Sequence, residues 1–155
     1  GANPKRSRIP SDTLAQLHDA ASQSKHRYLP HIITLALETG MRRGEILSLT
    51  WGQYFPEKRL LELIDTKNGH GRFVPLSSKA MAAISHGAKQ NERVFPMTGN
   101  AVRLAWERLL RTSDIRGLRF HDLRHEAISG MTVPQVAAIS GHRTISMLFR
   151  YAHVL

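Results

Sequence analysis

His121, Arg124 and His125 lie within the short stretch FHDLRHE, residues 120–126. Residues three or four apart share one face of an α-helix, so His121 would lie beside both other side chains. Histidine carries protons near neutral pH, and arginine binds phosphate through its planar guanidinium. The stretch could form a phosphate clamp with a proton carrier, half of a metal site, or a solvated helix face. Aspartate follows the first histidine where the H-E-x-x-H metal motif has glutamate, and no third ligand is evident, so we favour the clamp.

Further groups suited to phosphate chemistry are spread along the chain. Arg42 and Arg43 follow a helix-ending glycine in ETGMRRGE, which would leave their guanidinium groups free to hold an anion. Lys67 precedes an Asn-Gly turn and could donate a proton from a hairpin tip. His142 lies at a helix break, and Tyr151 follows nine residues later. Taken singly, each is better explained as a surface arginine, a turn lysine, a histidine at a turn or a packing tyrosine.

The composition favours one globular domain with a polyanionic partner. The chain has 155 residues, 41% of them hydrophobic, and a formal net charge of +10 from 22 basic and 12 acidic side chains. Nucleic acid is the most common partner for such a charge, and no basic amphipathic helix suggests a membrane surface instead. No apolar run reaches the roughly 20 residues that span a bilayer. The absence of cysteine excludes disulfides and thiolate zinc sites, and with a polar, basic N-terminus we expect no signal peptide and a cytoplasmic protein.

The elements that would position these groups are mostly helical. Helical spacing and stop signals predict helices at Ser11–Ser22 (with Ser11-Asp12 as N-cap), Pro30–Thr39, Arg43–Ser48, Ser77–Ser85 and Asn100–Thr112, then three short helices between His121 and His153. The runs Leu60–Asp65 and Gly71–Leu76 flank Asn68-Gly69, which indicates a β-hairpin. We therefore expect a mainly α domain with a small antiparallel β-sheet (α+β) over residues 11–155, preceded by a basic linker at residues 1–10.

In order along the chain, the candidate residues form a set that resembles the tyrosine recombinase (phage integrase) family. The box T-G-x-R-x-x-E of that family matches residues 39–45, TGMRRGE, and its hairpin lysine matches Lys67. Its H-x-x-R box matches His121 and Arg124, its G-H box matches Gly141-His142, and its nucleophile matches Tyr151 in FRYAH. The resemblance extends from about residue 11 to the end of the chain and is strongest to prophage and bacterial integrases. It implies the catalytic domain of such an enzyme, joined by residues 1–10 to an N-terminal core-binding domain that this chain lacks.

The resemblance implies a DNA strand-breaking and rejoining reaction with no cofactor and no metal. Tyr151 would attack the scissile phosphate to give a 3′-phosphotyrosine, which conserves the phosphoester bond and needs no ATP. Arg42 and Arg124 would neutralise the phosphate oxygens, and His121 would assist loss of the phenol proton. Lys67 would protonate the leaving 5′-oxygen, and His142 would donate a hydrogen bond to the phosphate. Attack by a 5′-hydroxyl from a second duplex would then complete strand exchange and religation.

The resemblance also sets expectations for partners and for the remaining residues. The partner would be double-stranded DNA, with the fragment monomeric alone and the full-length protein tetrameric on paired sites. Arg43 is expected to contact the DNA backbone or a carboxylate such as Glu45, and His125 is expected to have a positioning or packing role. The segment between the H-x-x-R and G-H boxes is shorter than the family usually shows. Two alternatives remain: a type IB topoisomerase-like enzyme that relaxes DNA, or a DNA-binding module with vestigial catalytic residues.

Overall fold

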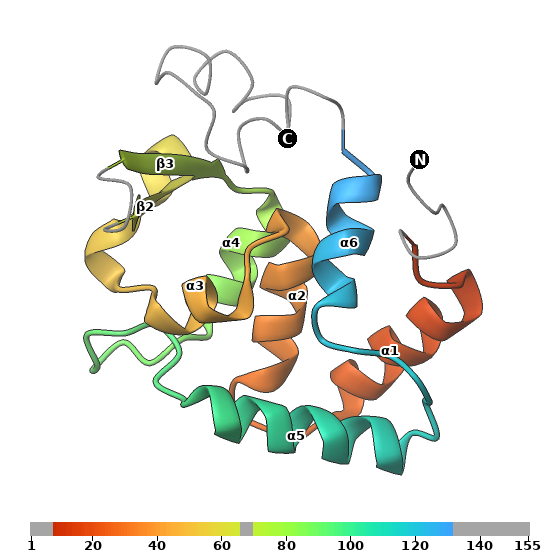
Figure 1. The fold of residues 1–155 in the computed structure, drawn as a ribbon. Coiled ribbons are helices and arrows are strands. Elements are labelled where there is room, and N and C mark those ends of the chain that lie inside the picture. The colour runs from red at the N-terminus through yellow and green to blue at the C-terminus, as the bar shows by residue number, and fades with distance from the viewer. Residues whose placement is uncertain (1–7, 66–69, 132–155) are drawn as a thin grey trace.

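The computed structural model describes residues 8–65 and 70–131; the other residues are drawn as a thin grey trace in Figure 1. The helices are α1 (Ser11–Gln23), α2 (Leu29–Thr39), α3 (Arg43–Ser48), α4 (Ser78–Ser85), α5 (Gly99–Thr112) and α6 (Asp122–Ser129). The strands are β1 (Tyr54–Phe55), β2 (Leu60–Asp65) and β3 (His70–Pro75), with short 3₁₀ turns at Trp51–Gln53 and Pro56–Lys58. The predicted mainly α fold with a small antiparallel sheet is confirmed.

Helix α2 is the central element of the domain. Its sequence LPHIITLALET is apolar on nearly every face, and it packs against α4 and α6 and also contacts α1, α3 and α5. A short helix that is hydrophobic all round is stable only when neighbouring elements cover it. Gly40 ends α2 in the left-handed conformation, with φ of 73° and its N–H bonded to the Ala36 carbonyl. This conformation favours glycine, and it turns the chain directly into α3.

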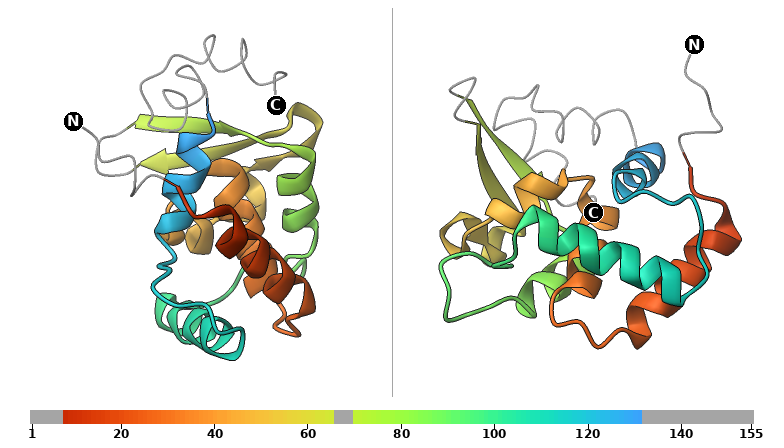
Figure 2. Two further views of the ribbon diagram at one scale, coloured as in Figure 1. Left: turned by 90° about the vertical axis from the view of Figure 1, so that its right-hand side faces the viewer. Right: turned by 60° about the horizontal axis from the view of Figure 1, so that its bottom comes forward.

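The three strands form one antiparallel sheet in the order β1-β2-β3. The register pairs Leu61 with Val74 and Leu63 with Arg72, so the hairpin brings Arg72 next to a buried leucine rather than into solvent. Figure 2 shows the sheet at one end of the molecule and α5 at the opposite end, with α2 and α6 between them. Both strand predictions are confirmed to within one residue, whereas β1, only two residues long, has no counterpart in the sequence prediction.

Helix starts agree with their predicted positions, but one predicted cap is wrong. Ser77 and Thr98 accept hydrogen bonds from Ala80 and Ala101 through their hydroxyl oxygens and so cap α4 and α5. Ser11 was expected to cap α1 together with Asp12, but it is the first helical residue, and Pro10 precedes the helix without a side-chain cap. The helix starts at Ser11 as predicted, but the cap position falls to Pro10, whose fixed φ is compatible with a helix start and whose ring has no acceptor for a cap hydrogen bond. The helices predicted after residue 131 lie outside the described residues.

No helix of the described ranges combines the length and the apolar character needed to cross a bilayer.

Candidate active site

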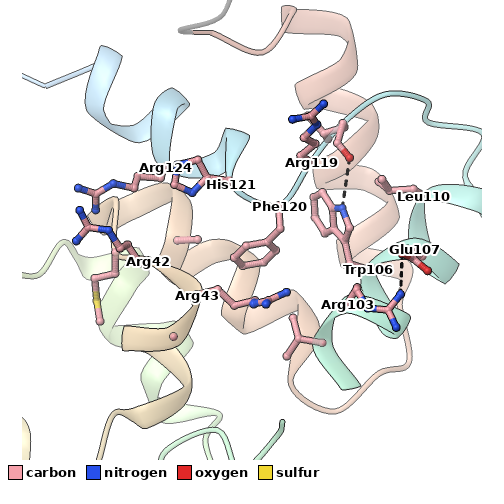
Figure 3. Close-up of a pocket in the computed structure, with 15 residues that line it drawn as sticks. Arg42, Arg43, Arg103, Trp106, Glu107, Leu110, Arg119, Phe120, His121 and Arg124 are labelled. Carbon is pink, nitrogen blue, oxygen red and sulfur yellow. Dashed lines mark hydrogen bonds and ion pairs between the residues drawn. The ribbon is translucent and has the colours of Figure 1, made fainter. Parts of the chain in front are cut away.

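Three of the six predicted catalytic residues line one cavity. Arg42 stands at the start of α3, and His121 and Arg124 come from the start of α6. The cavity has a volume of about 580 Å³ and lies between α3, α5 and the segment leading into α6. In Figure 3 the guanidinium groups of Arg42 and Arg124 lie next to one another, with the His121 ring beside them. Residues 79 positions apart in the sequence thus converge on one surface, as the resemblance predicts.

Arg124 is fixed by the main chain at the end of α2. Its Nη1 donates a hydrogen bond to the carbonyl oxygen of Gly40, across the interface of α2 and α6. Burial lowers the pKa of Arg124, and the positive charge of Arg42 lowers it further, while Glu45 opposes both. The guanidinium remains charged at neutral pH because arginine starts from a very high pKa. One nitrogen is therefore committed to Gly40, and Arg124 is at the same time part of the cavity lining.

Glu45 joins the start of α3 to the hairpin. Its carboxylate accepts two hydrogen bonds from the Arg72 guanidinium of β3, one of them 2.9 Å long, and a third from the backbone N–H of Arg42. Burial raises the pKa of Glu45, but the hydrogen bonds and charges of Arg72 and Arg42 together hold it below its ordinary value. Glu45 is thus ionised at neutral pH. It caps α3 and links Arg42 to the strand that follows the hairpin turn.

The Arg42 side chain is the most accessible of these arginines. It is 59% exposed, and its Nη1 lies 4.0 Å from the Glu45 carboxylate, at the limit of an ion pair. An exposed pair of this length contributes little stability. The guanidinium is therefore available to an anion that enters the cavity beside Arg124.

His121 is exposed at the rim of the cavity, and its ring lies edge-on to that of His125 with 4.9 Å between the centroids. Burial lowers the pKa of His121, and the charges of His125, Arg124 and Arg42 lower it further, against an opposing contribution from Asp122. The ring is consequently neutral at pH 7 and able to accept a proton. His125 is exposed, so a packing role is not supported, and its expected positioning role stays a prediction.

The rest of the cavity lining combines apolar side chains with further arginines. Trp106 of α5 packs edge-on against Phe120 with 5.3 Å between ring centroids, and its Nε1 donates to the Leu118 carbonyl. Arg119 adds a positive charge to the lining, whereas Arg103 is paired with Glu107 at 3.1 Å. Arg43 also lines the cavity, with its guanidinium against Gly99 at the start of α5. The ion pairs of Glu45 in the described part of the chain are with Arg42 and Arg72, so the expected contact between Arg43 and Glu45 is absent there.

Lys67, His142 and Tyr151 lie outside the described residues, and their predicted roles stay predictions. Over residues 8–65 and 70–131, no three histidine, cysteine or carboxylate side chains come together as a metal site. Sequence reasoning missed Arg72, whose contact with Glu45 depends on the strand register. The signal available was its place five residues after Lys67 on the second strand of the predicted hairpin.

The comparison with known proteins decides the family. The model of the phage integrase family matches residues 7–155, nearly the whole chain. The chain belongs to the phage integrase family. Its relatives include the shufflon-specific DNA recombinase of Escherichia coli, 42% identical over 144 residues, which cover 85% of this chain and 36% of the relative. A putative integrase/recombinase of Haemophilus influenzae is 41% identical over 120 residues, covering 73% of this chain and 33% of the relative.

Solved structures of integrases share the fold. The catalytic domain of bacteriophage HP1 integrase superposes with a TM-score of 0.67 at 25% identity, covering 94% of this chain and 86% of that one. A lambda integrase dimer bound to a core site gives a TM-score of 0.69 at 18% identity, covering 98% of this chain and 61% of that one. The chain spans only about a third of the length of the curated relatives named above. It corresponds in extent to the integrase catalytic domain.

Proposed function

We propose that residues 11–155 form the catalytic domain of a site-specific tyrosine recombinase acting on double-stranded DNA, with residues 1–10 as the linker from a preceding domain. The observation that carries the proposal is the convergence of Arg42, Arg124 and His121 on one cavity. Two guanidinium groups side by side, near a Glu45 carboxylate that is bound mainly by Arg72, suit a phosphodiester whose oxygens gain charge in the transition state. The basic side chains of Arg43 and Arg119 in the lining suit the flanking DNA backbone.

The reaction conserves phosphoester bonds. The Tyr151 hydroxyl oxygen attacks the phosphorus, the bond from phosphorus to the 5′-oxygen breaks, and a 3′-phosphotyrosine forms. His121 accepts the phenol proton, directly or through water, since its lowered pKa keeps it neutral. Lys67 donates a proton to the leaving 5′-oxygen, and His142 donates a hydrogen bond to the phosphate. A 5′-hydroxyl from a second duplex then reverses the step and releases Tyr151.

A suicide substrate, nicked so that the short strand carrying the freed 5′-hydroxyl diffuses away, tests the chemistry. We expect the full-length protein to accumulate a covalent adduct on its own DNA site. Tyr151→Phe should abolish the adduct and leave DNA affinity largely intact, because the phenol oxygen is the nucleophile and the ring is retained. Failure of the wild-type protein to form any adduct on that site would contradict the catalytic proposal and favour a binding module.

The outcome of cleavage needs its own assay. Strand exchange between two sites, placed in direct or inverted orientation on one plasmid, separates a recombinase from an enzyme that only relaxes supercoils. We propose a tetramer on paired sites for the full-length protein; one structural neighbour, at 17% identity and a TM-score of 0.65, is a lambda integrase tetramer bound to a Holliday junction. Relaxation without exchange at either orientation would favour the topoisomerase-like alternative.

A further inference from the structure

Helix α6 carries both His121 and Arg124 near its start, yet it has only eight residues. A helix this short is not stable by itself, so its rotational setting must come from contacts with its surroundings. Leu123 and Ala127 bury their side chains in the domain. On one face, Arg124 donates to the Gly40 carbonyl. Glu126 follows two residues later, roughly 200° around the helix axis, and therefore points to the opposite face.

Glu126 makes its contacts with the segment by which the chain enters the domain. Its Oε1 accepts a hydrogen bond of 2.7 Å from the backbone N–H of Ile9. Its Oε2 accepts one of 3.1 Å from the guanidinium of Arg8. The Glu126 side chain is only 10% exposed, whereas that of Arg8 is 62% exposed. We refer to the contacts of Glu126 with Arg8 and Ile9 as the N-terminal clasp.

A buried carboxylate contributes little net stability to the contact between two segments. Removing a carboxylate from water costs free energy that its partners only partly return, and an apolar residue of similar size often stabilises a protein as well or better. What a charged pair adds is a defined geometry, because each oxygen must meet its own donor. Ile9, whose backbone provides one donor, is itself buried in the core. The clasp therefore fixes the position of α6 against the entering chain more than it adds stability.

We propose that Glu126 is a positioning residue for the DNA cleavage step, acting through α6 on His121 and Arg124. The proposal rests on the function proposed above. The clasp holds α6 from the face opposite Arg124, so that the phosphate-binding groups take their orientation partly from Arg8 and Ile9. A displacement of the chain at Arg8 and Ile9 would therefore change the position of α6, and with it that of His121 and Arg124, although neither Arg8 nor Ile9 binds the phosphate in this proposal.

The test measures the rate of covalent adduct formation in a single turnover, with saturating suicide DNA and the full-length protein. Glu126→Ala should lower this rate by about tenfold or more while the Kd for DNA stays unchanged, because small displacements of catalytic groups slow chemistry strongly. Glu126→Gln keeps an acceptor for the Ile9 N–H and loses only the ion pair, so its rate should fall by about threefold. Arg8→Ala removes the same ion pair from the other side and should slow cleavage equally.

The double variant Arg8→Ala/Glu126→Gln decides between positioning and a separate role of Arg8 on DNA. If both single changes break one ion pair, the double variant is no slower than either single variant. The proposal is overturned if the rate losses of Arg8→Ala and Glu126→Gln multiply in the double variant, or if neither single variant is slower than wild type. Both outcomes can be read even if Glu126→Ala fails to fold. Val94→Ala, a core truncation in the segment after α4, provides a destabilised control. Equal loss of cleavage rate in this control would also overturn it, whereas a wild-type protein without adduct contradicts only the proposed function.

Discussion

Replacing Glu45 by glutamine removes a negative charge that two arginines share. The Glu45 carboxylate lies within ion-pair distance of both Arg42 and Arg72. The Arg72 side chain is 13% exposed and that of Glu45 is 23% exposed, so the variant leaves a guanidinium largely buried without its counter-ion. Loss of one partner from a buried pair costs about 3–5 kcal/mol. Because water reaches Glu45 and glutamine retains one acceptor oxygen, we expect a loss of about 2 kcal/mol in the free energy of unfolding.

The pH dependence of this loss provides the sharper test. The pKa of Glu45 is lowered in the folded protein from its ordinary value of 4.5. Its charge therefore stabilises the fold fully above that value, and this contribution is lost as the pH falls through the lower, folded pKa. Urea unfolding, followed by the fluorescence of the two tryptophans, should show the full difference between wild type and Glu45→Gln at pH 7 and a smaller one near pH 3.5.

Glu92→Gln is the matched control, because the Glu92 side chain is exposed. It should change the free energy of unfolding by no more than about 0.5 kcal/mol. The reasoning is refuted if Glu45→Gln is as stable as this control at pH 7. It is also refuted if the destabilisation by Glu45→Gln is the same at both pH values.

Three further outcomes are expected. Arg124→Lys should slow adduct formation by about 100-fold, because an ammonium cannot bind the Gly40 carbonyl and a phosphate at once as a planar guanidinium can. A rate above a tenth of that of the wild type would contradict this prediction. Because the pKa of His121 is lowered, the cleavage rate should decrease with falling pH only below pH 6.5. His121→Gln should cleave more slowly and lose this pH dependence; the same pH dependence in His121→Gln would show that another group causes it. Burial and the nearby His86 charge lower the pKa of His31, so the unfolded chain takes up a proton at this histidine before the folded protein does as the pH falls below 6.5. Thermal unfolding should therefore show a loss of stability below pH 6.5 that is smaller in His31→Phe.

Much of the fold is visible in the sequence because local signals agree with the tertiary structure. Gly40 predicts the end of α2 from its own conformational freedom, and Asn68-Gly69 predicts the hairpin from turn chemistry. Strand β1 escapes prediction because two residues are too few to display an alternating pattern. The predicted cap at Ser11 is wrong because Ser11 is already the first helical residue and Pro10 occupies the cap position.

The candidate site divides in the same way. Arg42, His121 and Arg124 could be identified because each belongs to a local box whose spacing is preserved along the chain. Arg72 and the partners of Glu126 could not, since their contacts join residues 27 and 117 or more positions apart. Such contacts depend on strand register and on the path of the entering chain, neither of which leaves a periodic signal in the sequence.

The bond between Arg124 and Gly40 has a consequence for how this domain can vary. The acceptor is a main-chain oxygen, so it is present whatever side chains occupy α2. A library that randomises the half-buried positions of α2, such as Thr34 and Leu37, should therefore keep Arg124 anchored, because changes of side chain there do not remove the acceptor of its hydrogen bond. Substitutions at position 40 are different, because φ is 73° there and a side chain would tilt the carbonyl itself. Tolerance to mutation should thus fall abruptly at this one residue, and saturation mutagenesis with a recombination readout would map that step.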